Sequence, residues 1–109
     1  MKLKIADNYW KVKLLTRKEF DNKFENGCAL TDIENKTIYF VRDNINKNTV
    51  FHETFHVFFS LALVASSELT MDQTEEVAAE VMGKYAEDYI RISRKMFNML
   101  KKELQKTNK

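Results

Sequence analysis

The stretch that decides the fold is Thr49–Ala65, with the sequence "TVFHETFHVFFSLALVA". It contains both histidines of the chain, four residues apart, and a glutamate directly follows the first. The residues that flank them are mostly apolar, so the segment predicts a helix packed into the core. Polar side chains within such a segment need hydrogen bonds or a ligand. The stretch therefore predicts a core helix that carries a polar site.

The polar residues have the spacing of a zinc site. On a helix, His52 and His56 lie about one turn apart on the same face, so their imidazoles can converge on one ion. Zinc accepts two neutral nitrogens and a carboxylate at roughly 2.0–2.2 Å and keeps a position for water. Glu53 lies roughly 100° around the helix from His52, where it can act as a general base on that water. His52-Glu53-Thr54-Phe55-His56 matches the H-E-x-x-H signature of zinc metalloproteases. A hydrogen-bonded polar cluster without a metal is the alternative.

A third protein ligand must come from elsewhere in the chain, since two histidines do not complete a zinc site. No other histidine exists, and the single cysteine, Cys28, precedes the motif. The last predicted helix carries Glu75, Glu76 and Glu80. At about 100° per residue, Glu75 lies nearest the apolar face of that helix. We therefore predict Glu75 as the third ligand, with Glu76 and Glu80 as alternatives.

The remaining pattern predicts one α+β domain over residues 1–109, without repeats or a linker. A small antiparallel sheet or hairpin is expected to pack on the H-E-x-x-H helix and on a long C-terminal helix. The predicted elements are a strand at Trp10–Leu15, a short helix capped by Thr16 and ended by Gly27, a hairpin at Cys28–Val41, a helix from about Ile45–Thr49 to Ser66, and a helix from about Gln73 to beyond Leu100 capped by Thr70 or Asp72.

Composition restricts the setting and the partners. Cys28 is the only cysteine, so no disulfide forms within the chain and a cytoplasmic location is expected; we predict a buried Cys28. The apolar run Val57–Ala65 is too short to span a bilayer, so no membrane is expected. A net charge of +2 with scattered lysines does not favour a nucleic-acid partner. A homodimer through the last helix is an option, because Met96, Met99, Leu100 and Leu104 lie beyond the expected core contacts.

Three segments together make the chain resemble a small zincin of the ImmA/IrrE-like metallopeptidase family, found in phages and mobile elements. They are "GCALTDIENKTIYFV", "TVFHETFHVFF" and "TEEVAAEVMGKY", and the resemblance covers about Ala29–Ile92. It implies that His52, His56 and Glu75 bind Zn²⁺ and that Glu53 is the catalytic base. It also implies a cytosolic endopeptidase, whose protein substrate would be a repressor or a host factor. Thr54 departs from the family, where an aliphatic residue is usual at this position.

The resemblance also indicates how a substrate would bind. The strand Thr37–Val41 is the candidate for a sheet edge, where an extended peptide can add as a further strand; an ordinary core strand is the alternative. Tyr85 and Tyr89 are secondary candidates for a hydroxyl that stabilises an oxyanion. The rival hypothesis is a non-enzymatic binding module of a phage or mobile element that keeps the zincin fold.

Overall fold

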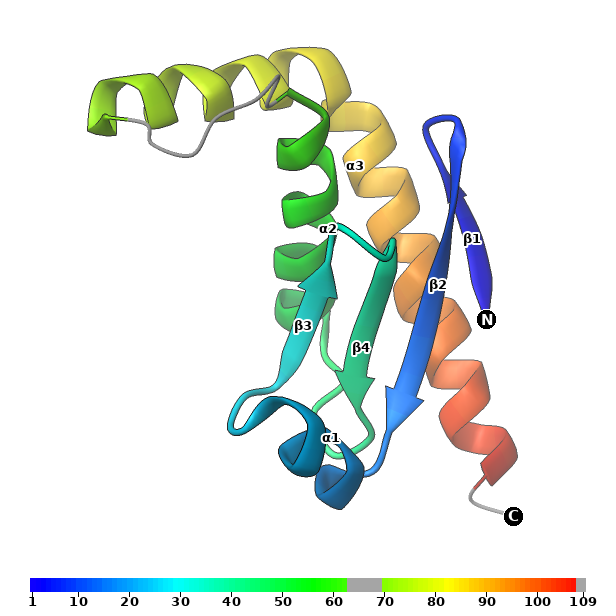
Figure 1. Ribbon diagram of the computed structural model, residues 1–109. Coiled ribbons are helices and arrows are strands. Elements are labelled where there is room, and N and C mark those ends of the chain that lie inside the picture. Colours follow the sequence, from blue (N-terminus) through cyan, green and yellow to red (C-terminus); the bar gives the residue numbers. More distant parts are fainter. Residues whose placement is uncertain (63–69, 108–109) are drawn as a thin grey trace.

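The computed structural model describes residues 1–62 and 70–107, which form a four-stranded sheet and three helices (Figure 1). The predicted α+β class is confirmed. In chain order the elements are β1 (Lys2–Ile5), β2 (Asn8–Leu15), α1 (Arg17–Phe24), β3 (Ala29–Asp32), β4 (Thr37–Val41), α2 (Lys47–Ala62) and α3 (Met71–Thr107).

The sheet is mixed, with the strand order β1-β2-β4-β3. The outer pairs are antiparallel, as the predicted Cys28–Val41 hairpin requires, but β2 and β4 run parallel in the centre. The prediction of an antiparallel sheet is therefore wrong. The physical reason is that α1 and β3 return the chain to the edge from which β2 started, so β4 runs alongside β2 in the same direction.

Strand β1 is an element that the sequence interpretation missed. Leu3 and Ile5 are buried and alternate with exposed lysines, which is the pattern of a strand with one buried face. The turn to β2 places Ala6 at a φ of 56°, a conformation usually taken by glycine or asparagine. Because position 6 is an alanine and not a glycine or asparagine, the sequence did not indicate a hairpin turn between β1 and β2.

The two faces of the sheet are covered by different helices. As predicted, Ile38 and Phe40 share one face of β4, and Tyr39 and Val41 share the other. The first face packs against α2 and α3, which lie together behind the sheet in Figure 1. On the opposite face, α1 covers Tyr39 and Val41 through Phe20. The buried residues of the main core are Leu3, Ile5, Trp10, Val12, Ile38, Phe40, Val50, Val57, Phe58, Val81, Ile92, Met96 and Leu100.

Local side-chain caps set the starts of the helices. Thr16 and Glu19 form the predicted capping box of α1, but the helix ends at Phe24, before Gly27, because Glu25 adopts a positive φ of 65°. For α3, Thr70 accepts from the Gln73 amide at 3.1 Å while the Gln73 side chain accepts from the Thr70 amide at 2.9 Å. Thr70, rather than Asp72, is thus the cap. The predicted end of α2 at Ser66 lies outside the described residues.

Two contacts hold the connection from β4 to α2. Asn46 caps α2 by accepting a hydrogen bond of 2.9 Å from the Thr49 amide. Arg17 of α1 donates to both carboxylate oxygens of Asp43, at 3.0 and 2.8 Å, and to the carbonyl of Gly27 at 2.6 Å. The hydrogen bond from Arg17 lowers the pKa of Asp43 below its usual value. These contacts orient the helix that carries the histidines.

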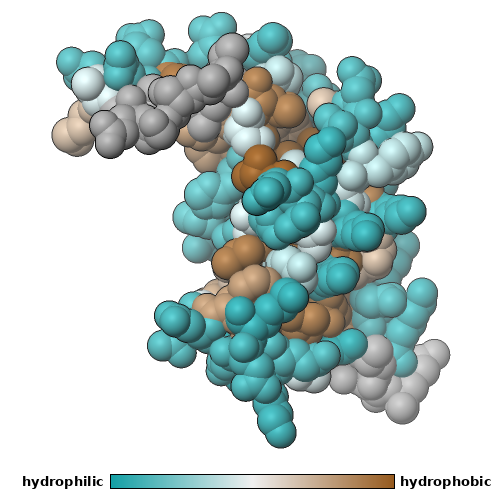
Figure 2. All heavy atoms as spheres, viewed as in Figure 1, coloured by the Kyte–Doolittle hydropathy of each residue, from teal (hydrophilic) through white to brown (hydrophobic). Residues whose placement is uncertain are grey.

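Helix α3 is bent, and its first part projects from the body (Figure 1). We call Met71–Glu80 the acidic arm, because it contains four acidic residues and no basic residue. Figure 2 shows that this projecting end is mainly hydrophilic and that apolar residues gather below it. The second part of α3 packs in the core: Met96 and Leu100, which the sequence interpretation assigned to a dimer surface, have no exposed area. Met99 and Leu104, the other two residues of the predicted dimer surface, are partly exposed, so a dimer through this helix stays a prediction.

Two further predictions concern Cys28 and the membrane. Cys28 is exposed, so the prediction of a buried cysteine is wrong; it immediately precedes β3 and lies outside both apolar clusters. Within residues 1–62 and 70–107, no helix combines the length and the apolar character needed to cross a bilayer.

Two methionines of α3 test the division between core and arm. Met96→Ala should lower the free energy of unfolding by about 2–5 kcal/mol, because it opens a cavity in a fully buried site. The matched change Met71→Ala, at a side chain that is 82% exposed, should alter it by less than about 0.5 kcal/mol. Chemical denaturation measures both values. Equal losses in the two variants would contradict the described packing of α3.

Candidate metal centre

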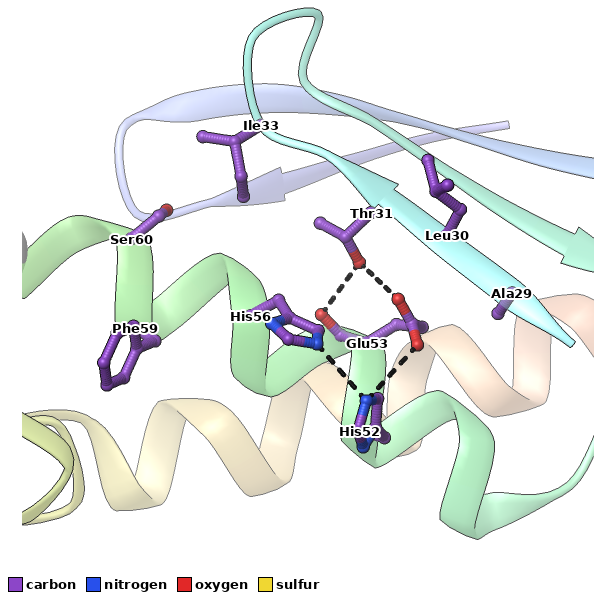
Figure 3. A pocket seen from close by; sticks show the side chains of 9 residues that line it. All are labelled: Ala29, Leu30, Thr31, Ile33, His52, Glu53, His56, Phe59 and Ser60. Atoms are coloured by element: carbon purple, nitrogen blue, oxygen red, sulfur yellow. Dashed lines mark hydrogen bonds and ion pairs between the residues drawn. The ribbon is translucent and has the colours of Figure 1, made fainter. Parts of the chain in front are cut away.

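The two histidines lie side by side on the exposed flank of α2 (Figure 3). The Nε2 atoms of His52 and His56 are 3.2 Å apart, and the ring planes meet at 77°. The His52 side chain is 66% exposed, so a ligand can approach the pair from solvent. The helix thus directs both nitrogens at one point, as the spacing of four residues predicts.

The separation of the nitrogens fits a shared ion. Two nitrogens that each lie about 2.0–2.1 Å from a tetrahedral zinc are about 3.3 Å apart. The observed 3.2 Å is close to this value, so the rings could take up a metal with little movement. The same distance also fits a hydrogen bond between two neutral imidazoles, one donating and one accepting. The geometry is therefore compatible with a metal site and with a metal-free polar pair.

Glu53 differs from the histidines in being buried. Its exposed fraction is 7%, and its side chain extends from α2 toward β3 (Figure 3). One carboxylate oxygen, Oε2, lies 3.8 Å from Nε2 of His52. One donor atom from each of the three motif residues lies within 4.8 Å of the others, so they form a group that could hold a cation. The carboxylate is near enough to the imidazoles to contact either an ion or a water molecule between them.

Thr31 of β3 holds this carboxylate in place. Its hydroxyl lies 2.8 Å from Oε1 of Glu53 and 3.2 Å from the Glu53 carbonyl oxygen, and it donates its single proton to this pair of acceptors. A buried carboxylate is costly unless it accepts hydrogen bonds, so the contact matters for stability as well as orientation. The sequence interpretation missed Thr31. Because side chains alternate along a strand, Thr31 and Leu30 lie on different faces of β3. Only the tertiary structure shows that the face with Thr31 meets α2, while Leu30 packs with the cluster around Phe20.

The site opens into a groove of about 440 Å³ between α2 and β3. Its lining residues are Ala29, Leu30, Thr31, Ile33, His52, Glu53, His56, Phe59 and Ser60 (Figure 3). Among the described strands, β3 has a neighbour on one side only. The prediction that Thr37–Val41 is the edge strand is therefore wrong: β4 lies between β2 and β3, and all its residues are buried. The edge next to the histidines belongs to β3.

The structure does not bring the predicted third ligand to the histidines. Glu75, Glu76 and Glu80 are all exposed on the acidic arm, and none belongs to the group around His52. Glu76 and Glu80 instead line a separate hollow, together with Lys84. As a metal ligand Glu75 stays a prediction.

The packing register of the two helices explains this placement. The ring centroids of Phe58 and Tyr85 are 5.5 Å apart, and the hydroxyl of Thr54 lies 3.9 Å from the sulfur of Met96. The earlier residue of α2 thus meets the later residue of α3, so the two helices run antiparallel. Tyr85 is thus level with the part of α2 just beyond the second histidine. Glu75 precedes Tyr85 by ten residues, which is about 15 Å along a helix. The separation of 19 residues from the second histidine to Glu75 is enough to bring a carboxylate back to the histidines. The register in which α3 packs on α2, however, places Glu75 beyond them.

The hydroxyls of two residues near the motif, Tyr89 and Thr54, donate to backbone carbonyls of α2. The hydroxyl of Tyr89 donates to the carbonyl of Phe51 at 2.8 Å, and burial raises the pKa of this phenol. Neither Tyr89 nor Tyr85 lines the groove, so the structure does not support them as oxyanion donors. Thr54, which departs from the aliphatic residue of the family, is fully buried and donates to the carbonyl of Val50 at 2.8 Å. It fills a core position with its hydroxyl satisfied.

Comparison of the chain with protein-family models, with curated protein sequences and with solved structures finds no match. The resemblance to ImmA/IrrE-like metallopeptidases therefore stays a prediction carried by the motif and the order of the elements.

Variants of Thr31 test its role as the partner of Glu53. Thr31→Val removes the hydroxyl with little change in shape and should lower the free energy of unfolding by about 1.5–3 kcal/mol, since the partner is a buried carboxylate. Thr31→Ser keeps the hydroxyl and should retain most of that stability. Urea denaturation at neutral pH measures the difference. If the serine variant loses as much as the valine variant, the methyl group rather than the hydrogen bond supports the site.

Proposed function

We propose that the protein is a zinc-dependent endopeptidase that cleaves a protein substrate in the groove between α2 and β3. One observation carries the proposal: two imidazole nitrogens lie 3.2 Å apart beside a buried carboxylate that is held by a hydrogen bond. A zinc hydrolase needs these three groups close together on a surface that a substrate can reach.

In this proposal the histidines and a carboxylate of the acidic arm bind the metal, and Glu53 transfers the proton. His52 and His56 would hold Zn²⁺ through Nε2, with a carboxylate of the acidic arm, Glu75 first among the candidates, as the third ligand. When bound, the ion supplies Lewis acidity, which lowers the pKa of water and polarises a carbonyl group. Glu53 is the general base. Its Oε1 accepts from Thr31, so Oε2 is the oxygen that faces the imidazoles and is free to take a proton.

Hydrolysis then requires two proton transfers through Glu53. The carboxylate takes a proton from water as the water oxygen bonds to the carbonyl carbon of the peptide. The same proton passes to the amide nitrogen as the carbon–nitrogen bond breaks, which returns Glu53 to its ionised form. Because Thr31 fixes the carboxylate, the base is held in one orientation through both transfers.

The groove indicates an extended peptide as the substrate. Among the described strands, β3 is an edge strand and lies beside the histidines, so a peptide could pair with it through main-chain hydrogen bonds. Phe59 and Ile33 provide apolar surface on the two sides of the groove, and Ile33 is 42% exposed. We propose a repressor or a host factor in the cytoplasm as the natural substrate, as the resemblance implies.

The alternative is a binding module that keeps this fold without catalysis. One observation favours it: among the described residues, no arm carboxylate joins the two histidines, which would then form a hydrogen-bonded pair. A binding module of this kind would have no need of an ionisable side chain at position 53.

A Glu53→Gln variant separates the two functions. We expect it to retain zinc and to lose cleavage of fluorescein-labelled casein by at least about 100-fold, because an amide cannot accept the proton. Glu34→Gln, the same change at an exposed residue of the β3–β4 turn, should leave both properties unchanged. Cleavage by the Glu53→Gln variant at the wild-type rate, or no cleavage by the zinc-loaded wild type, would contradict the proposed peptidase.

Zinc content tests the metal site independently of any substrate. Protein purified without chelator should contain about one zinc per chain, and His52→Ala should remove most of it, since one remaining imidazole binds weakly. Elemental analysis by mass spectrometry gives the ratio. A wild-type ratio near zero after incubation with excess zinc would favour the metal-free imidazole pair.

A further inference from the structure

The acidic arm is a helix whose charged side chains are exposed. Asp72, Glu75, Glu76 and Glu80 are all exposed, and no ion pair of the described residues involves them. The arm is about 15 Å long, from ten residues at 1.5 Å each, and it projects from the body (Figure 1). Within residues 1–62 and 70–107, these four acids are thus exposed and without an ion-pair partner.

The arm cannot easily turn back onto its own histidines. Val81, which follows it directly, is completely buried in the main core, and Val77 packs against the same core. These contacts fix the base of the arm at the far end of α2. Moving Glu75 to the histidines would withdraw both valines from the core, and the fully buried Val81 alone contributes about 1.5–3 kcal/mol. The described packing therefore opposes a ligand from the same copy.

A second copy offers a surface of opposite charge. The later part of α3, Arg91–Thr107, contains six basic residues and one acidic residue. Lys47, Arg94 and Lys101 line a groove of about 450 Å³ with Phe51, the residue directly before His52. Positive charge thus lies where the first turns of α2 meet α3, and it would attract an acidic helix that approaches α2.

The flank of α2 also offers apolar contact. Phe55 and Phe59 are half-buried and contact each other at 5.8 Å. At 100° per residue, Phe59 lies about 20° and Phe55 about 60° around the helix from His52. A helix laid along this flank would therefore meet aromatic rings on one side and the two imidazoles on the other.

We propose that the acidic arm of one copy docks on α2 of a second copy and supplies the third metal-binding carboxylate to His52 and His56 there. The proposal rests on the metal site of the proposed function. Glu75 and Glu76, at the middle of the arm, are the residues that reach the imidazoles. Exchange of the two arms about a two-fold axis gives a closed dimer with two sites, each built from both copies. Metal binding and dimer formation are then coupled, and high salt weakens both.

Mixing two defective variants tests this arrangement. One is His52→Ala/His56→Ala, which keeps the arm but cannot bind the ion; the other is Glu75→Gln/Glu76→Gln/Glu80→Gln, which keeps the imidazoles. Each alone should bind Co²⁺ at least about 100-fold more weakly than the wild type, since loss of mere outer-shell partners already costs 10–100-fold. The equimolar mixture should recover about one quarter of the wild-type number of tight sites, because about half of random dimers are mixed and each holds one complete site.

Cobalt absorption measures the tight sites, and analytical ultracentrifugation measures the mass of the same samples. The wild type should sediment as a dimer with Co²⁺, and Glu87→Gln, the same change at an exposed acid of α3 outside the arm, should behave like the wild type. A wild type that binds Co²⁺ tightly as a monomer, or a mixture without recovery, overturns the arm exchange but leaves the metal site intact. A wild type that binds no Co²⁺ overturns the metal site and the arm exchange together.

Discussion

The hydrogen bond between Thr31 and Glu53 is the interaction on which the site depends. Glu53 lies on the most apolar helix of the chain and is almost fully buried, so it needs a partner wherever α2 packs. The partner comes from β3, a strand that precedes α2 by way of β4 and a loop. A register error of one residue in β3 would turn Thr31 to the other face and leave the carboxylate without its donor. The contact thus specifies how the hairpin docks on the helix.

The same helix gives its three polar residues opposite environments. Glu53 lies about 100° from His52 around α2, and this angle turns the carboxylate into the interface with β3 while both imidazoles remain exposed. A base that is shielded and fixed stands next to ligands that are open to solvent. This arrangement suits hydrolysis in a groove, because the substrate and the water can enter at the histidines while the base keeps its orientation.

Charge is distributed unevenly along α3: Met71–Glu80 carries four acids and no basic residue, whereas Arg91–Thr107 carries six basic residues and one acid. The acidic arm lies outside the body, while the basic second part of the helix packs its apolar face against α2 and the sheet. The uneven charge follows from what each part must do. The second part is fixed by Ile92, Met96 and Leu100 in the core, whereas Val77 is the arm residue that packs against this core among the described residues. The exposed acids of the arm are suited to contact with another molecule.

The sequence by itself determined the α+β class, the capping box at Thr16, the faces of β4, and the meeting of His52, Glu53 and His56. All of these follow from local rules: helical and strand periodicity and side-chain caps within a few residues. Only the tertiary structure decided that β2 and β4 are parallel, that β3 is the edge strand, that Thr31 holds Glu53, and that Glu75 lies away from the histidines. Each of these depends on how distant elements pair and on the register between them, which the packing of side chains such as Phe58 on Tyr85 sets and which no local pattern encodes.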